Sequence, residues 1–170
     1  RPLAKRRAPA RRLVVLISGQ NPTYDYYIRP RLGALPHVVV DIAKPATRRE
    51  PALQPGDYVL ACRYLSLRWA RLVARAPALA GVGLFFDDDY LAFLGDRAVP
   101  LLYRLDVARR TVWPLRMIRR RLSEVLVSTE ALRERYPLAR AGVLHPVPGE
   151  QDLAPAPVRG GPAIRVAFHA

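Results

Sequence analysis

Three consecutive aspartates, Asp87, Asp88 and Asp89, directly follow the apolar run GVGLFF. They are three of only fourteen acidic residues in a chain of 170 residues whose formal net charge is +14. Adjacent carboxylates repel one another, so they must be solvated, hydrogen-bonded at a helix start, or placed against a cationic or hydroxyl-rich ligand. One aspartate is enough to cap a helix, so a run of three points to binding or catalysis as well.

Polar and aromatic residues also follow the other apolar runs. RLVVLIS leads into GQNPTYDYY, and the runs beginning DYVLA and EVLVS lead into CRYLS and STE. Ligands of parallel α/β sheets bind at the carboxyl ends of the strands, so these segments should converge on one rim. The residues that we expect at this rim, besides the aspartates, are Gly19, Gln20, Asn21, Tyr24, Tyr26, Arg63, Tyr64, Ser128 and Thr129.

The elements that must position this rim alternate between strands and helices. Short, mostly β-branched or apolar runs predict strands at 12–18, 37–43, 81–86 and 124–128, with two more starting near Asp57 and Ala141. Helical spacing occupies the intervening segments, with short helices expected after Asp89 and after Ser128 or Thr129. Apolar strands alternating with helices are typical of an α/β, Rossmann-like parallel sheet with helices on both faces.

The longest helical pattern covers residues 100–122 and is interrupted by Pro114, which predicts a kink or a second helix starting there. The residues expected to form its buried face are Leu101, Leu105, Ala108, Val112, Leu115, Ile118 and Leu122. The residues on the opposite face are Arg104, Arg109, Arg110, Arg116, Arg119, Arg120 and Arg121. This arginine face is either a solvated surface or a patch for anionic lipid or another anion.

Composition limits the class of protein. The chain is 51% hydrophobic, has one cysteine, and contains neither zinc-ligand spacing nor an apolar run of about 18 residues, the length of a membrane span. It also has no recognisable nucleic-acid motif, so we expect no binding of nucleic acid. The missing zinc-ligand spacing leads us to expect no resident metal, and the lack of a membrane span or signal peptide leads us to expect a cytoplasmic protein. We expect a flexible basic arm at 1–12, one domain at 13–150, a linker at 151–163, and at 164–170 either a second domain's first strand or an added edge strand.

The segment EVLVSTEALRERYPLARAGVLHPVPG, followed by a linker and IRVAFHA, resembles the end of the N-terminal domain of GT-B-fold glycosyltransferases. FFDDDY resembles the acidic strand end of several bacterial members. The resemblance implies an enzyme of hexosyltransferase type that moves a sugar from a nucleotide-sugar to a carbohydrate or lipid-linked acceptor, with no other cofactor. This half would bind the acceptor and be inactive alone. The chain departs from the family in having only Gly19 after the first strand and in lacking the donor domain.

The resemblance also implies roles for the rim residues. One of the three aspartates would act as general base toward the acceptor hydroxyl, and the others would bind sugar hydroxyls. Tyr24 and Tyr26 would stack on sugar rings, although an Asn-Pro turn followed by packing tyrosines explains the same segment. Arg63 and Tyr64 would meet an acceptor phosphate, and His145 would lie near the interdomain cleft, although a lone histidine is more often structural. An acceptor on a lipid would favour peripheral attachment to the inner membrane face.

Three alternatives remain open. Asp87 and Asp89 spell the Asp-x-Asp motif with which GT-A glycosyltransferases hold a divalent metal against the donor diphosphate. The aspartates are also compatible with a simple cap for the helix near Tyr90. Finally, the whole domain would fit a non-catalytic Rossmann-like module that binds an anionic membrane or polyanion through its arginine face.

Overall fold

A six-stranded, wholly parallel sheet forms the centre of the protein, as the sequence predicts. The structure, a computed structural model, describes residues 9–44, 51–136 and 141–147. The strand order is β2-β1-β3-β4-β5-β6. The strands are β1 (Arg12–Ile17), β2 (His37–Asp41), β3 (Asp57–Cys62), β4 (Gly81–Phe86), β5 (Glu124–Val127) and β6 (Ala141–Val143). The expected linker at 151–163 and the strand at 164–170 lie outside the described residues, as does most of the arm.

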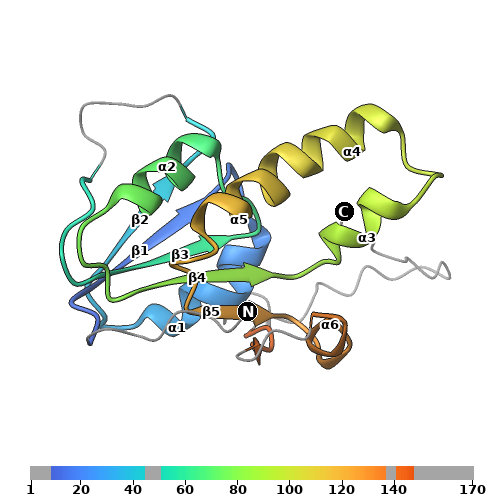
Figure 1. Cartoon of the computed structure of the whole chain (residues 1–170). Coiled ribbons are helices and arrows are strands. Elements are labelled where there is room, and N and C mark those ends of the chain that lie inside the picture. Colours follow the sequence, from blue (N-terminus) through green and yellow to red (C-terminus); the bar gives the residue numbers. More distant parts are fainter. Residues whose placement is uncertain (1–8, 45–50, 137–140, 148–170) are drawn as a thin grey trace, which may run out of the picture.

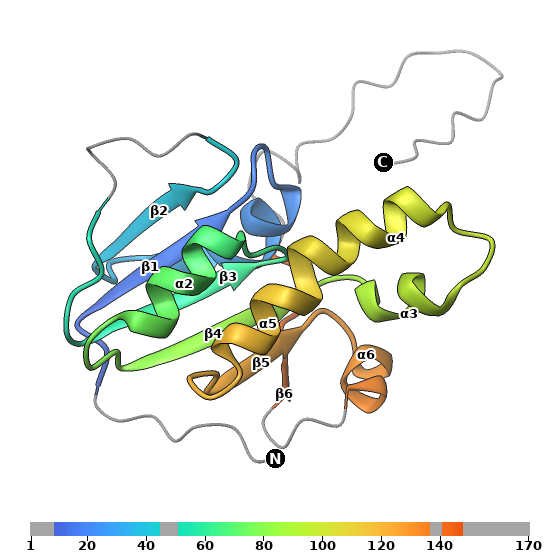
Figure 2. The same cartoon turned by 45° about the horizontal axis from the view of Figure 1, so that its top comes forward.

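Helices cover both faces of the sheet, which confirms the α/β prediction (Figures 1 and 2). On one face, α2 (Leu67–Arg75) and α5 (Trp113–Ile118) pack on the larger apolar core. On the other, η1 (Tyr24–Ile28) and α1 (Arg29–Leu32) pack on a smaller core around Val15. The remaining helices are α3 (Tyr90–Gly95), α4 (Leu101–Val107), η2 (Ala108–Val112) and α6 (Glu130–Arg135).

The central strands β3 and β4 are buried at every position, which is why their sequences read as continuous apolar runs. Two glycines of β4 leave room for the Tyr58 side chain of β3. A Cβ at Gly81 would lie 2.7 Å from a ring carbon of Tyr58, and one at Gly83 would lie 2.6 Å from its hydroxyl. The glycines therefore allow an aromatic side chain to lie flat across the neighbouring strand.

Helices α4 and α5 form one continuous helical rod, joined by the π-helical turn η2. Pro114 lies in the first turn of α5, as predicted, and cannot donate a backbone hydrogen bond to Arg110. The carbonyl of Arg110 accepts a hydrogen bond from the backbone N–H of Leu65 instead, at 3.2 Å. The proline thus frees an acceptor that attaches the rod to the loop after β3.

The buried face predicted for 100–122 is only partly right. Ile118 and Leu122 are buried as expected, but Leu101 and Leu105 are 61% and 52% exposed. Figures 1 and 2 show the reason, because α4 extends past the carboxyl end of the sheet, where no strand lies beneath it. Among the described residues, no helix is long and apolar enough to cross a membrane.

Candidate functional site

The segments after β1, β3, β4 and β5 meet at the carboxyl edge of the sheet, as predicted. The hydroxyl of Thr23, from the first segment, donates a hydrogen bond to Asp87 Oδ2. Arg63, after β3, lies with its Nε 3.2 Å from Asp87 Oδ1. Ser128, after β5, donates from its Oγ to the backbone carbonyl of Asp87 at 2.9 Å. One residue after β4 therefore collects contacts from three other strand ends.

The Asp87 carboxylate is the partly buried anchor of this cluster. Its side chain is 17% exposed, and it accepts hydrogen bonds from Thr23 and, at 2.8 Å, from the hydroxyl of Tyr90. Burial and the neighbouring Asp87 charge raise the pKa of Tyr90, so its hydroxyl stays protonated and remains a donor. Both carboxylate oxygens of Asp87 thus already accept hydrogen bonds from the protein, which makes Asp87 a poor candidate for binding a ligand.

Arg63 joins the carboxylates to the aromatic residues beneath them. Its Nε donates to the Tyr90 hydroxyl at 2.6 Å, and its Nη2 lies 3.3 Å from Asp88 Oδ2. Burial by itself lowers the pKa of Arg63, but Tyr90 and the Asp87 charge outweigh it, and the pKa is raised. Its φ of 69° makes it the one non-glycine residue with positive φ among the described residues. Such backbone strain persists where surrounding contacts hold a side chain in place, and it is concentrated at functional sites.

Asp88 is the accessible member of the three. Its side chain is 55% exposed, against 17% and 20% for Asp87 and Asp89. Its contacts with Arg63 and with the Tyr90 hydroxyl, at 3.3 and 3.4 Å, are long and use the same oxygen, Oδ2. Asp88 therefore combines an oriented carboxylate with exposure to solvent, which is the arrangement that a ligand needs.

Asp89 serves as the predicted helix cap. Its Oδ1 accepts from the backbone N–H of Ala92 at 3.0 Å and from the Tyr136 hydroxyl at 2.6 Å, and Oδ2 pairs with Arg135. Asp87 and Asp89, the two carboxylates of the Asp-x-Asp motif, are thus each bonded to a different set of side chains. No group of three or more His, Cys, Asp and Glu side chains able to hold a metal occurs in the described part of the chain.

The loop after β1 is held mainly by its own contacts. Gly19 has a φ of 64°, and its N–H donates to Asp41 Oδ1 at 2.8 Å. That hydrogen bond, partly opposed by burial, lowers the pKa of Asp41. Asn21 is 5% exposed and accepts from the Tyr24 N–H at 3.2 Å, so it shapes the turn. Gln20 is exposed. This favours the turn interpretation for Asn21 and leaves Gln20 accessible at the rim.

The other predicted residues divide between the rim and supporting roles. Tyr64 is half-buried, with its ring 5.4 Å from that of Tyr90. Thr129 caps α6 by accepting from the Leu132 N–H at 3.2 Å. Tyr24 and Tyr26 are half-buried, and the Tyr26 carbonyl accepts from Val147 at 2.8 Å. His145 is exposed, and its carbonyl accepts from Arg31 of α1 at 2.6 Å.

A cavity of about 360 Å³ opens at the same edge of the sheet, and none of the three aspartates is among its lining residues. The strand order changes direction between β1 and β3, and the cavity lies at the carboxyl ends of these strands, the usual ligand position in such sheets. Tyr64 lines it and also contacts the Asp87–Asp89 cluster through Tyr90. The other lining residues are Ser18, Ile42, Ala43, Leu65, Ser66, Leu67, Arg109 and Arg110.

The sequence did not single out Ser18, Ser66 and Thr23 as site residues, although each is a polar residue beside a predicted strand or helix end.

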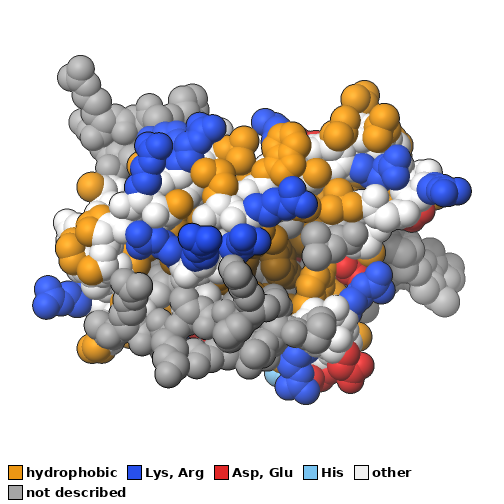
Figure 3. Space-filling view, in the orientation of Figure 1, with side chains coloured by type: hydrophobic (Ala, Val, Ile, Leu, Met, Phe, Trp, Pro, Cys, Tyr) orange, Lys and Arg blue, Asp and Glu red, His pale blue; other side chains and the backbone are white. Residues whose placement is uncertain are grey.

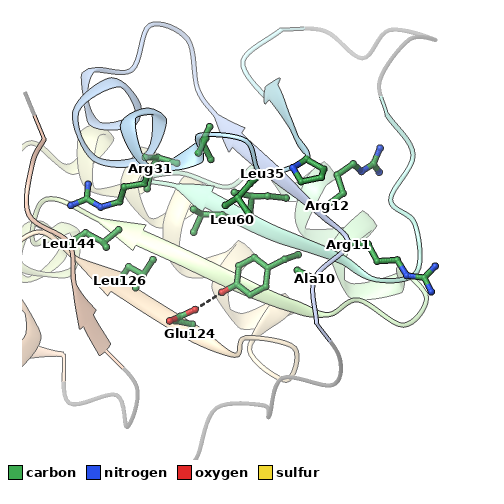
Figure 4. Close-up of a pocket in the computed structure, with 14 residues that line it drawn as sticks. Ala10, Arg11, Arg12, Arg31, Leu35, Leu60, Glu124, Leu126 and Leu144 are labelled. Atoms are coloured by element: carbon green, nitrogen blue, oxygen red, sulfur yellow. Dashed lines mark hydrogen bonds between the residues drawn. The ribbon is translucent and has the colours of Figure 1, made fainter. Parts of the chain in front are cut away.

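A second cavity, of about 470 Å³, lies on the η1 and α1 face (Figure 4). Its lining is mostly apolar and includes Leu60, Leu126 and Leu144. It extends to Arg12 and Glu124 at the amino ends of β1 and β5, away from the aspartates. There the Tyr58 hydroxyl donates to Glu124 at 2.8 Å. This cavity is separate from the one at the rim, with which it shares no lining residue.

The predicted arginine surface lies along α4, η2 and α5 and continues into the turn after α5. Arg109 and Arg110 pair with Asp106, each at 2.9 Å, and Arg110 also lies 5.9 Å from the Tyr64 ring. Arg104 is half-buried, and its Nε has no hydrogen-bond partner. Arg121 is also half-buried, and the exposed members besides Arg109 and Arg110 are Arg116, Arg119 and Arg120. Arg110 therefore links the arginine surface to the cavity.

Comparisons of the chain with protein-family models, with curated proteins and with solved structures found no match.

Proposed function

We propose that this domain is the acceptor-binding half of a GT-B-type glycosyltransferase, which transfers a sugar from a nucleotide-sugar to an acceptor hydroxyl. The single observation that carries the proposal is Asp88, an exposed carboxylate held by Arg63 at the carboxyl edge of a parallel sheet. The cavity at the change of strand direction supports the proposal as a place for the acceptor, because Tyr64 of its wall contacts Tyr90 of the carboxylate cluster. The resemblance of residues 124–148 to the end of such a domain supports the same assignment.

In the proposed reaction, the acceptor hydroxyl donates a hydrogen bond to Asp88. As the hydroxyl oxygen bonds to the anomeric carbon of the donor, the bond from that carbon to the nucleoside diphosphate breaks. Asp88 takes the hydroxyl proton, and the nucleoside diphosphate leaves with the bonding electrons. Arg63 and Tyr90 hold the carboxylate in position, and Tyr64 offers an aromatic surface at the cavity wall. Binding of the donor nucleotide is assigned to residues outside this domain.

The test is release of nucleotide from a panel of UDP- and GDP-sugars by the full protein, with simple glycosides and a lipid extract as acceptor sources. We expect acceptor-dependent release, and Asp88→Asn should lower turnover at least about 100-fold, the usual contribution of a general base. Asp96→Asn is the matched control, because Asp96 is an exposed aspartate that accepts from the Ala98 N–H. No release from any donor, or an Asp88→Asn variant as active as the control, would overturn the proposal.

A titration of this chain with UDP and GDP, with and without Mn²⁺, separates the proposal from the GT-A alternative. The alternative requires Asp87 and Asp89 to hold a metal and a diphosphate, so it requires metal-dependent nucleotide binding here. The GT-B proposal requires none, because its donor site lies elsewhere. Metal-dependent binding that is lost in Asp87→Asn would favour GT-A.

A further inference from the structure

Large apolar side chains are exposed along the rod formed by α4, η2 and α5. Leu102 is 82% exposed, Leu101 is 61% and Leu105 is 52% exposed. Farther along the rod, Trp113 and Met117 are 48% and 38% exposed. We call these five residues the apolar row. Several exposed apolar residues on one helical rod indicate a surface that binds something apolar, since a soluble surface normally scatters them singly.

The same rod carries an unusually dense positive charge. Residues 97–123 contain eight arginines against one acidic residue, a net charge of +7, whereas the whole chain has +14. The one acid, Asp106, is paired with Arg109 and Arg110. Arg116 near the end of the rod is exposed, as are Arg119 and Arg120 in the turn that follows it. Half of the net charge therefore lies on 27 residues that also carry the apolar row.

The placement of the rod leaves this surface accessible. Its buried line, which includes Val107, Thr111, Pro114 and Ile118, faces the core, so the apolar row and the exposed arginines lie on its other sides. Figures 1 and 2 show α4 extending beyond the sheet, and Figure 3 shows hydrophobic and basic side chains close together over α4 and α5. Leu101 and Leu102, at the start of α4, accordingly remain largely exposed in the described part of the chain.

We propose that the α4–α5 surface binds an anionic lipid bilayer, with the apolar row inserted among the lipids and the arginines against their phosphates. Helices that lie in a membrane interface combine these two features, leucine and tryptophan for the acyl boundary and arginine for the headgroups. A nucleic acid or another hydrophilic polyanion would use the arginines but leave the apolar row in water. An anionic lipid surface accounts for both features, because its phosphates complement the arginines and its acyl chains accommodate the exposed leucines.

This proposal does not depend on glycosyl transfer, and its test needs no sugar. The chain is mixed with sedimentable vesicles of phosphatidylcholine alone, or of phosphatidylcholine and phosphatidylglycerol in equal parts. We expect binding to the anionic vesicles and little to the neutral ones. Leu102→Ser with Leu105→Ser should weaken binding at least about tenfold, because burial of each leucine contributes to insertion. Arg116→Gln, Arg119→Gln and Arg120→Gln together should weaken it about 100-fold.

Matched controls lie elsewhere on the surface. Leu35→Ser replaces a leucine that is 58% exposed, and Arg29→Gln replaces an exposed arginine, both outside the rod. Both should bind anionic vesicles like the unaltered chain. Every substituted side chain is exposed, so all variants should keep the thermal midpoint of unfolding, which is measured in parallel.

Trp113 provides a direct readout of insertion. The chain has two tryptophans, and Trp69 is only 1% exposed, so a change of emission on adding vesicles reports Trp113. We expect a blue shift with anionic vesicles that is absent in Trp113→Phe. Failure of the unaltered chain to bind anionic vesicles would overturn the proposal, as would full binding by the leucine variant. A dimer in solution that the leucine variant dissociates would also overturn it, because a second copy would then cover the apolar row.

Discussion

The hydroxyl of Thr23 donates a hydrogen bond to the carboxylate of Asp87, although 64 positions separate the two residues in the chain. This contact joins the segment after β1 to the end of β4. Asp87 also faces Arg63 and Tyr90, so a single carboxylate fixes three segments of the rim. Two neighbouring aspartates of the same type therefore have different roles, with Asp87 holding the rim together and Asp88 exposed above it.

The first prediction separates these roles by stability. Asp87→Ala should lower the free energy of unfolding by about 2–3 kcal/mol, because it leaves the partly buried Arg63 without its main counter-charge. Asp88→Ala should change the free energy by no more than about 0.5 kcal/mol, as is usual for an exposed side chain. Urea unfolding followed by circular dichroism measures both. Equal losses in the two variants would contradict the assignment of Asp87 as the anchor.

The second prediction concerns the backbone of Arg63. A left-handed backbone costs a residue with a Cβ roughly 1–2 kcal/mol, and glycine avoids that cost. Both Arg63→Ala and Arg63→Gly lose the contacts with Asp87 and Tyr90, so both should be less stable than the unaltered chain. Arg63→Gly should nevertheless be more stable than Arg63→Ala by about 1 kcal/mol. If urea unfolding ranks alanine above glycine, then the positive φ is not strained.

The sheet could be predicted from the sequence because β3 and β4 are buried on both sides and are apolar throughout. The buried face of residues 100–122 could not, because periodicity says which residues share a face but not where the sheet beneath them ends. Leu101 follows the helical pattern and is nevertheless exposed, since α4 extends beyond the strands. The position of α4 relative to the end of the sheet is a tertiary relationship, and the spacing of apolar residues within one helix does not contain it.

The segments that form the rim could be predicted from the sequence, but the different roles of the three aspartates could not. Parallel strands place their carboxyl ends at one edge, so Arg63 and Asp87 were expected to lie near each other. Which aspartate becomes the partly buried anchor depends on Thr23 and Tyr90, and their hydroxyls are positioned by the fold. Thr23 reads in the sequence as one more residue of an Asn-Pro turn, so its role became visible only in the structure.

The third prediction concerns Cys62, which is fully buried in β3. Burial, reinforced by the charge of Asp87, raises the pKa of its thiol to about 12. The reactive thiolate is therefore almost absent at neutral pH. In the folded protein Cys62 should resist a thiol reagent such as DTNB, and in denaturing urea it should react fully. Rapid reaction of the folded chain would mean that β3 opens readily, and Cys62→Ser gives the background rate.

The fourth prediction is a pH dependence that originates at Asp41. The N–H of Gly19 donates to its carboxylate, so the pKa of Asp41 is lower in the folded protein than in the unfolded chain. The carboxylate therefore adds stability that is fully present above its unfolded pKa of about 3.9 and is lost as the pH falls through the lower, folded pKa. Asp41→Asn keeps an oxygen acceptor but does not ionise. The difference in free energy of unfolding between the unaltered chain and Asp41→Asn should be about 1–2 kcal/mol at neutral pH and should shrink below about pH 4.

Urea unfolding at a series of pH values measures this difference, and Asp96→Asn, at an exposed site, is the control. A difference that stays constant from neutral to acidic pH would show that Asp41 does not hold the Gly19 turn through its charge.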